Sequence, residues 1–567
     1  MAYDLQPMKA PKTAGWMLRA LVWLIGLPVI GRPLCHKLLS DAGLFRIREH
    51  QSSEGMHWGP MIPRSSATDG APMSPGDLGQ ASSATAFPEG WRPRTAHDYI
   101  SAYRAGTTTP AEVAERVIAA QAELDAHPTP MAMFISTSAE DLRAQAADST
   151  KRWSAGAPLS PLDGVPVSVK DEMNQRGYRT TLGTSFLGES EEAHDATIVG
   201  RMRDAGALLI GKTNMHEVGL GVTGINVHHG ATRNPYDRNR SPGGSSSGSA
   251  ATVGSGLVPI ALGADGGGSI RIPAALCGAV GLKATWGRLS EHGVPPLCWS
   301  VAHVGPIAAS VNDCALAYGV MAGVDPHDEA THGQPRPHLD GLGDRDLSGV
   351  RVGLYRPWFE DAHPEVVEGC DRGLAALVDA GAEVVEIEVH DLAMIKTAHM
   401  ISIIGEIASS QRAFEPAHTN RYGVETRLNL RLAAALGVHD YVGAQRERGR
   451  LYRQLDTLFE SVDVIVTPTT GRTAPIIPKN ALKTGLSNLP DTDQIMRFAP
   501  LANLTGLPAI SVPSGVDSSG LPIGLQLLGR AWEEHTLLRL AGVVERAVPR
   551  TAPNVEVNPL GTTPEQP

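Results

Sequence analysis

The segment from residue 243 to residue 281 constrains the fold most strongly, because 11 of its 39 residues are glycine and only Asp265 and Arg271 are charged. It holds two strings, Gly-Gly-Ser-Ser-Ser-Gly-Ser-Ala at 243–250 and Asp-Gly-Gly-Gly-Ser-Ile-Arg at 265–271. A flexible linker can be this rich in glycine, but the apolar runs 253–260 and 270–280 adjoin the strings and need burial. The segment therefore predicts bare backbone packed inside a folded domain.

Two chemical interpretations of buried glycine and serine strings remain, a phosphate cradle and a nucleophile site. The segment 243–281 contains no phosphate-binding loop of the G-x-x-x-x-G-K-[ST] type. Ser269 follows three glycines, whose small size lets backbone N–H groups approach a substrate oxygen. The sequence therefore favours a nucleophile site.

Composition excludes several classes of protein. The 567 residues are 42% hydrophobic and 19% charged, which is typical of a folded protein with a sizeable core. A net charge of −11 disfavours nucleic acid as a partner, because a phosphate backbone needs a basic patch. Five scattered cysteines without a C-x-x-C pair argue against a disulfide framework or a zinc site and indicate a reducing compartment.

Residues 14–31 form the one apolar segment that could contact a membrane, with an uncharged run from Ala20 to Ile30. As a helix, that run is about 16 Å long, roughly half of a 30 Å hydrocarbon core, so it is too short to span. No small-x-small cleavage site follows, so we expect an intracellular protein that is not secreted. Two interpretations stay open: a helix packed on the body or on a dimer mate, and an interfacial helix anchored by Trp16 and Trp23.

Helical and strand patterns alternate from about residue 96, which predicts an α/β protein. A capping box with Pro110 at the first helical position predicts a helix through about Asp125. The apolar stretch 164–169 predicts a buried strand that ends at Lys170. Further strands are expected at 207–210, 350–354, 383–387, 462–467, 508–513 and 524–528.

The intervals between Lys170, Ser245 and Ser269 along the sequence are specific for one protein family. Ser245 follows Lys170 by 75 residues and precedes Ser269 by 24, and in this pattern the chain resembles the amidase signature family. The similarity extends over GKTNMHE (211–217), RNP (233–235), LCGAVGLK (276–283), DVIVTPTTG (463–471) and GLPIGLQLLGR (520–530). Within that family the chain is most similar to the plant-type fatty acid amide hydrolases, in MKAP (8–11), GLGVTG (219–224), TPTTGRTAPIIP (467–478) and MRFAPLANLTGLPAISVP (496–513).

The resemblance implies one large catalytic domain at 95–548, with a mixed, twisted central β-sheet covered by helices on both faces. A helical N-terminal extension at 1–50 and an irregular connector at 51–94 precede it, and a loose tail follows at 549–567. The resemblance also implies a homodimer.

The resemblance implies a serine amide hydrolase whose site uses no metal and no cofactor. Ser269 is the expected nucleophile, Ser245 is expected on a cis peptide bond as the proton relay, and Lys170 is the expected base. The expected oxyanion donors are the backbone N–H groups of Gly266, Gly267, Gly268 and Ser269, and Gly219 is expected to line the scissile bond. Ser246, Asp265 and Arg271 are expected to support the loop.

Histidine and cysteine add no second site to this expectation. His216, His228 and His229 lack partners at metal-site spacing, and Cys277 lies in an apolar run that favours burial.

The expected substrate is a fatty acid amide, with an N-acylethanolamine as the leading case. An acyl channel needs apolar walls, and the candidates from regional similarity are Ile403, Ile404, Ile407, Met496 and Phe498. Residues 14–35 are the candidate membrane contact. The alternatives are an aryl-amide or carbamate hydrolase on the same scaffold and an amidotransferase A-type subunit.

Overall fold

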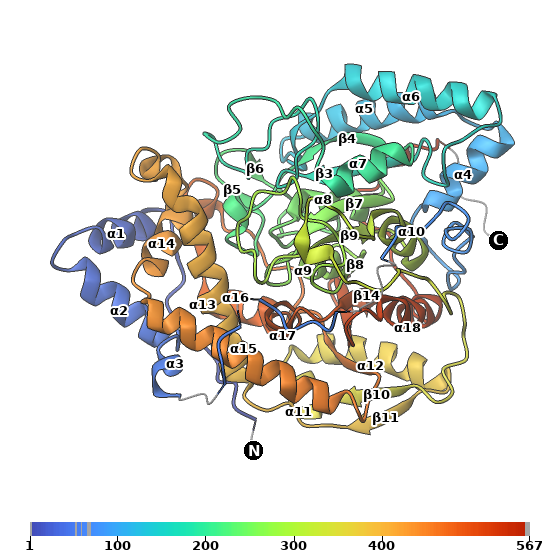
Figure 1. Ribbon diagram of the computed structural model, residues 1–567. Helices are drawn as coiled ribbons and strands as arrows, with labels where there is room; N and C mark the ends of the chain where they lie inside the picture. Colours follow the sequence, from blue (N-terminus) through green and yellow to red (C-terminus); the bar gives the residue numbers. More distant parts are fainter. Residues whose placement is uncertain (1–2, 9, 51–53, 58, 65–69, 562–567) are drawn as a thin grey trace.

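A mixed sheet runs through the middle of the computed structural model, which describes residues 3–8, 10–50, 54–57, 59–64 and 70–561 (Figure 1). Among these residues the sheet has 11 strands. In spatial order they are β11 (Glu383–Glu386), β10 (Arg351–Leu354), β12 (Val464–Pro468), β15 (Pro522–Gly529), β14 (Ala509–Val516), β8 (Val280–Lys283), β9 (Val304–Ala308), β7 (Ile260–Ala264), β3 (Pro166–Lys170), β4 (Leu208–Thr213) and β2 (Phe134–Ser136). The strands predicted from the sequence are confirmed, with ends that differ by a few residues.

Strand direction divides the sheet into three parts. Strands β11, β10 and β12 are parallel, and so are β7, β3 and β4 at the other side. The strands between these two groups pair antiparallel. Strand β3 is buried along its whole length, as its apolar sequence predicts.

Helices cover both faces of the sheet, as the neighbours of β15 show. Successive residues of a strand point to opposite faces. Ile523 packs against Gly369 of α12 (Pro364–Asp379), whereas Gly524 lies against Ala275 of α9 (Arg271–Leu276). This confirms the predicted α/β fold with a central sheet covered by helices on both faces.

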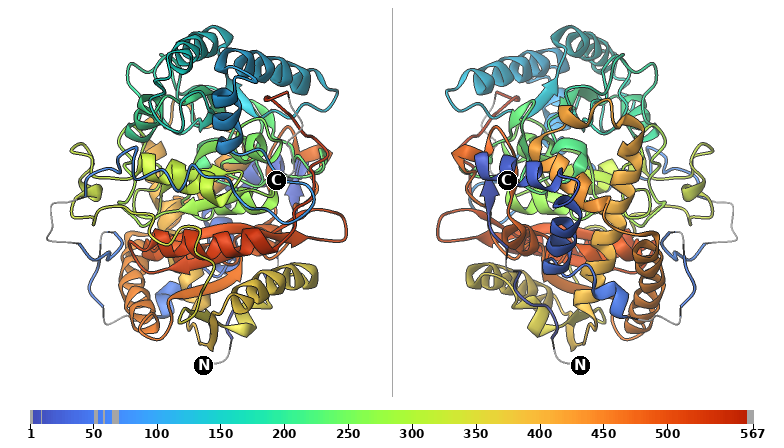
Figure 2. Two further views of the ribbon diagram at one scale, coloured as in Figure 1. Left: turned by 90° about the vertical axis from the view of Figure 1, so that its right-hand side faces the viewer. Right: turned by 90° about the vertical axis from the view of Figure 1, so that its left-hand side faces the viewer.

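The other helices complete these layers (Figures 1 and 2). The predicted helix after Thr109 is α5 (Pro110–Ala126), and its capping box forms, with Glu112 N donating to Thr109 at 3.2 Å and Thr109 N donating to Glu112 at 3.0 Å. The remaining helices are α4 (Ala96–Ala105), α6 (Ala139–Ser154), α7 (Thr197–Asp204), α8 (Ser247–Gly254), α10 (Val311–Met321), α11 (Arg356–Phe359), α13 (Leu392–Gln411), α14 (Val424–Ala433), α15 (Val438–Leu458), α16 (Leu489–Met496), α17 (Pro500–Thr505) and α18 (Glu534–Ala547).

The N-terminal extension is helical and packs on the large α/β body. Strand β1 (Thr13–Ala14) pairs with β13 (Leu486–Ser487), and α1 (Trp16–Ile25), α2 (Gly31–Asp41) and α3 (Arg46–Glu49) follow. The helix formed by the apolar segment ends at Ile25, because Gly26 and Pro28 follow. Leu18 and Val22 of α1 are buried against Val424 and Leu428 of α14, and Figure 1 shows the two helices side by side.

The connector and the tail differ in structure. Within 54–57, 59–64 and 70–94 the structure has no helix and only an isolated bridge at Trp91, as the irregular composition predicts. The tail up to residue 561 is packed rather than loose: Val555 N donates to Pro235 O at 2.9 Å and Val557 N donates to Ser255 O at 2.7 Å. Val555, Val557 and Leu560 are buried, so apolar side chains spaced along a Pro-rich segment anchor it.

One helix among the described residues has the length and apolar composition of a membrane span, residues 392–414. Of its most apolar window, 61% is buried inside the protein, which is typical of a core helix.

Candidate active site

Lys170 is the last residue of β3 and is completely buried. Strands β4 and β7 pair on either side of β3, so the sheet fixes the backbone of this residue. Its Nζ donates to Ser245 Oγ at 2.9 Å and to Ala264 O, at the end of β7, at 3.3 Å. Nζ also lies 2.7 Å from Glu172 Oε2. The structure thus brings Lys170 and Ser245 together from positions 75 residues apart.

Ser245 follows a cis peptide bond with Gly244, as the resemblance implies. Its carbonyl accepts a hydrogen bond from His216 N at 3.1 Å, and the residue is almost completely buried. Ser246 next to it exchanges hydrogen bonds with the backbone of Ala264, at 3.1 and 3.3 Å. Ser246 therefore ties the serine string to β7 and supports the loop.

The later serines of the string serve the backbone. Ser247 Oγ donates to Asn214 O at 3.2 Å, and Ser249 Oγ donates to Leu262 O at 2.9 Å. These bonds leave Ser245 as the hydroxyl of the string that faces Lys170.

Ser269 lies on the loop of residues 265–271, which we call the glycine loop, and is 7% exposed. Its backbone carbonyl accepts a hydrogen bond from Ser246 N at 3.4 Å, so the two strings are adjacent. Within the described part of the chain its hydroxyl has no hydrogen-bond partner. The hydroxyl is therefore available for another contact.

Backbone N–H groups of the glycine loop divide into engaged and free donors. Gly268 N donates to Asp265 Oδ1 at 2.6 Å, which does not fit the expectation that Gly268 is an oxyanion donor. The N–H groups of Gly266, Gly267 and Ser269 make no hydrogen bond to any described residue. Three of the four expected donors are free, because Asp265 uses the fourth to fold the loop.

Asp265 and Arg271 form the buried support of this loop. The Arg271 guanidinium contacts both carboxylate oxygens of Asp265, at 3.0 and 3.1 Å, and also donates to Gln526 Oε1 at 2.7 Å and Asn503 Oδ1 at 2.6 Å. Burial would raise the pKa of Asp265, but Arg271 and the Asn503 amide hold that pKa well below its usual range. The carboxylate therefore stays charged and keeps the loop in place.

Gly219 lies beside Ser245, as predicted. A Cβ atom on Gly219 would lie 3.8 Å from Ser245 Oγ and 3.4 Å from Leu297 Cδ1. Gly219 has a φ of 69°, and Val218 before it also has a positive φ, of 46°. The tight turn at 217–219 places the bare backbone of Gly219 against the serine.

The histidines near the site are structural. Burial lowers the pKa of His216 to about 4, so this side chain is neutral, and His228 Nε2 lies 2.7 Å from Glu217 Oε1. Among the described residues no group of three or more His, Cys, Asp or Glu side chains could hold a metal ion. Cys277 is buried, as predicted.

The structure adds site residues that the sequence analysis missed. Glu172 contacts Lys170, Asn503 donates to the Asp265 carboxylate at 2.9 Å, and His399 Nε2 lies 2.8 Å from Gly266 O. The position of Glu172, two residues after Lys170 at a strand end, was a local signal. Asn503 and His399 come from distant helices, and no local pattern marks them.

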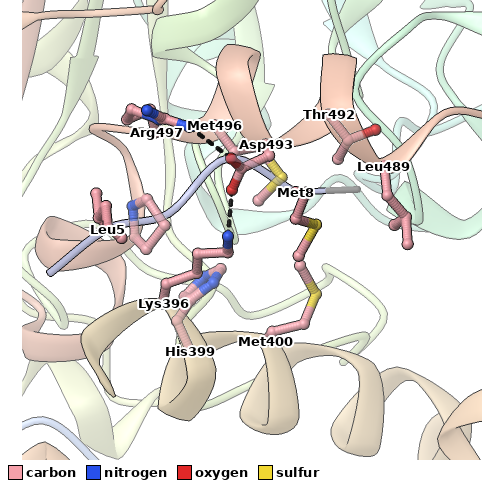
Figure 3. A pocket seen from close by; sticks show the side chains of 11 residues that line it. Leu5, Met8, Lys396, His399, Met400, Leu489, Thr492, Asp493, Met496 and Arg497 are labelled. Carbon is pink, nitrogen blue, oxygen red and sulfur yellow. Dashed lines mark hydrogen bonds and ion pairs between the residues drawn. The ribbon is translucent and has the colours of Figure 1, made fainter. Parts of the chain in front are cut away.

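A pocket shares two of its lining residues, His399 and Met496, with the surroundings of the glycine loop. Its lining includes Leu5, Met8, Met400 and Met496, with Met8, Met400 and Met496 on one side and the ion pairs of Asp493 with Lys396 and Arg497 on the other (Figure 3). A Cβ atom on Gly267 would lie 3.0 Å from Met496 Cε. The pocket is small, with a volume of about 30 Å³, and Leu5 and Met8 of the N-terminal segment contribute to its lining.

The apolar channel candidates separate into two groups. Met496 and Ile403 approach the glycine loop, because a Cβ atom on Gly266 would lie 3.4 Å from Ile403 Cδ1, and Ile407 packs with Leu297 in the same cluster as Ile403. Ile404 and Phe498 pack in a different apolar cluster, so they do not share one wall with the first group.

Comparison with known proteins identifies the family. The family model for amidases matches residues 115–538. The chain belongs to the amidase signature family. As a member it is an amidase, a hydrolase of carbon–nitrogen bonds, and it is similar to fatty acid amide hydrolases.

Two relatives and one solved structure define this similarity. A fatty acid amide hydrolase of Medicago truncatula is 41% identical over 578 residues, covering 96% of this chain and 94% of the relative. The A-type subunit of a glutamyl-tRNA(Gln) amidotransferase from Roseiflexus is 37% identical over 476 residues, covering 80% of this chain and 96% of the relative. The structure of the peptide amidase from Stenotrophomonas maltophilia matches with a TM-score of 0.69 at 30% identity, covering 81% of this amidase and 98% of the solved chain.

Proposed function

We propose that this amidase hydrolyses fatty acid amides to a fatty acid and an amine through an acyl-enzyme on Ser269. The observation that carries the proposal is the buried contact of 2.9 Å between Lys170 Nζ and Ser245 Oγ, beside the glycine loop that presents Ser269. A serine hydroxyl attacks a carbonyl well only when a base removes its proton. In this mechanism Ser245 passes the Ser269 proton to Lys170.

The free N–H groups of Gly266, Gly267 and Ser269 then stabilise the oxyanion of the tetrahedral intermediate. Each such donor typically contributes about 3–4 kcal/mol to transition-state stabilisation. Ser245 returns a proton to the leaving nitrogen as the intermediate collapses, because an unprotonated amine anion is a very poor leaving group.

The nucleophile is tested with a fluorophosphonate probe. Ser269→Ala should abolish labelling while the circular dichroism spectrum stays unchanged. Ser249→Ala is the matched control, because the Ser249 hydroxyl bonds the Leu262 carbonyl and its loss should leave labelling intact. Persistent labelling of the Ser269→Ala variant would contradict the assignment.

The proposed substrate has a long acyl chain. Support comes from the relatives: plant fatty acid amide hydrolases match 96% of this chain, whereas the amidotransferase relative matches only 80% of it. An N-acylethanolamine is the leading case, and an aryl amide or a carbamate is the alternative.

Chain-length dependence tests the substrate class. kcat/KM should rise with acyl length across N-acylethanolamines, and Met400→Trp should reduce it for long chains only, because the added indole fills the pocket that Met400 lines. Flat or falling values, or a preference for aryl amides, would rule out a lipid-selective site.

We further propose that the amidase works at the surface of an intracellular membrane, as a homodimer, with α1 and the start of α2 in contact with lipid. Trp16 and Trp23 are 77% and 64% exposed on α1, and Val29 and Ile30 are exposed just beyond it. Arg19 and Arg32 are exposed among them. Exposed tryptophans beside cations are typical of a helix that lies in a lipid interface.

A further inference from the structure

The ε-amino group of Lys170 is surrounded by three acceptors. They are Ser245 Oγ at 2.9 Å, Ala264 O at 3.3 Å and Glu172 Oε2 at 2.7 Å. Two of these contacts are hydrogen bonds and the contact with Glu172 is an ion pair. An ammonium group has three N–H bonds and no lone pair, so a charged Lys170 can only donate. In this state Lys170 cannot accept the proton of Ser245, and a base must first be made from it.

Glu172 depends on Lys170 to balance its charge. The side chains of Lys170 and Glu172 are 1% and 8% exposed, and Oε2 of Glu172 makes no other polar contact within the described part of the chain. A buried carboxylate whose counter-ion becomes neutral is strongly destabilised. The charges of Lys170 and Glu172 therefore have to be lost together.

Further acidic groups face this pair from two other segments. Glu291 and Cys298 lie on the loop after β8, and Glu406 lies on α13; burial, together with Asp328 and Glu172, raises the pKa of Glu291 well above its usual range. Burial also raises the pKa of the Cys298 thiol, with Glu406 as the next cause. Asp171 pairs with Lys212 instead, at 3.2 Å. These surroundings disfavour an unpaired negative charge on Glu172.

We propose that Glu172 accepts a proton from Lys170 and so converts Lys170 into the neutral amine that the reaction needs. An N–H bond at Nζ breaks and an O–H bond at Oε2 forms, so ammonium and carboxylate become amine and carboxylic acid with no change in the net charge of the pair. The lone pair left on Nζ takes the Ser245 proton while Ser245 takes the proton of Ser269. The protons return by the same route when the amine leaves.

Glu172 is thus a positioning residue that acts through Lys170, and the inference rests on the proposed function. It makes a prediction about pH that an ordinary ion pair does not make. With Glu172 present, the singly protonated pair is competent, so activity persists to low pH. In the variant Glu172→Gln, activity requires that Lys170 lose its proton to solvent.

The test is the rate of fluorophosphonate labelling between pH 5 and 9 for the wild type, Glu172→Gln, Glu172→Asp and Glu291→Gln. In a plot of labelling rate against pH, the acid limb of Glu172→Gln should lie at least about one pH unit above that of the wild type. Glu172→Asp should keep the wild-type limb at a reduced rate. Glu291→Gln is the control for a nearby acid that does not contact Lys170, and its limb should not move.

The inference would be overturned if the acid limb of the Glu172→Gln profile moved to lower pH or did not move. A carboxylate that only stabilises the charged form of Lys170 opposes loss of the Lys170 proton, so its removal would make that loss easier. If Glu172→Gln does not fold, Glu172→Ala with added formate decides: restored labelling at low pH supports the proton transfer, and no restoration contradicts it. Labelling reports on Ser269 whatever the natural substrate is. Absence of labelling in the wild type would contradict the proposed function as well, whereas normal wild-type labelling with an unmoved variant contradicts only this inference.

Discussion

At the scale of single residues, the glycines around Ser269 are required by the space that surrounds them. A Cβ atom on Gly266 would lie 2.7 Å from Cys298 Sγ, and one on Gly267 would lie 2.9 Å from His399 Cε1. Gly268 has a φ of 106°, and its Cβ would lie 2.5 Å from Ile272 Cδ1. The loop can therefore carry no side chain between Asp265 and Ser269 without displacing its neighbours.

At Gly219, the effect of adding a side chain near the site can be measured separately from the effect of backbone strain. Its φ is 69° and a Cβ would fit, 3.8 Å from Ser245 Oγ, whereas Gly177 has a φ of 83° with nothing within 4 Å. Gly219→Ala and Gly177→Ala should each lose about 1–2 kcal/mol of unfolding free energy in urea titrations, since both force an alanine into the left-handed region. Only Gly219→Ala should lower kcat/KM, by about tenfold or more, because the new methyl group takes up space next to Ser245 in the candidate site. Equal kinetics in the two variants would place Gly219 outside the site.

At the scale of elements, α14 connects the site to the N-terminal extension through Glu425. Its carboxyl group accepts a hydrogen bond from Leu486 N of β13 at 2.7 Å, and β13 pairs with β1. The other oxygen lies 3.7 Å from His216 Nε2. Burial raises the pKa of Glu425 to about 8, so the carboxyl is protonated in the folded protein at neutral pH.

This raised pKa predicts a pH-dependent stability. The unfolded chain loses the Glu425 proton near pH 4.5 and the folded chain only near 8, so the contribution is fully present below the lower value and is lost as pH rises through this window. Between pH 5 and 8 the wild type should lose about 3–4 kcal/mol relative to Glu425→Gln, which keeps an acceptor but does not titrate. Urea denaturation of both proteins at several pH values measures the difference. Parallel pH profiles would show that Glu425 is not protonated in the fold.

At the scale of the whole molecule, α1 has two faces with separate roles. Leu18 is completely buried against α14, whereas Trp23 on the same helix is 64% exposed. The first face attaches the extension to the catalytic domain, and the second is the one assigned to lipid in the proposed function.

The two faces can be tested by a matched pair of variants. Leu18→Ala should lower the unfolding free energy by about 3 kcal/mol, since it leaves a cavity in a packed cluster. Trp23→Ala should change stability by less than about 0.5 kcal/mol, as is usual for exposed positions, while co-sedimentation with anionic liposomes falls several-fold. Unchanged liposome binding in Trp23→Ala would remove the membrane role and leave a second copy of the chain as the remaining occupant of this face.

The α/β class, most strands, the capped helix at Pro110–Ala126 and the three residues whose spacing carries the family resemblance can all be predicted from the amino-acid sequence. These follow from local periodicity, capping chemistry and motif spacing, which need no knowledge of what packs where. Only the tertiary structure decided that Glu172 faces Lys170, that Gly268 N–H is used by Asp265, and that the tail is packed. Each of these depends on which side chains long-range strand pairing and helix packing bring into contact, and a linear pattern does not contain that information.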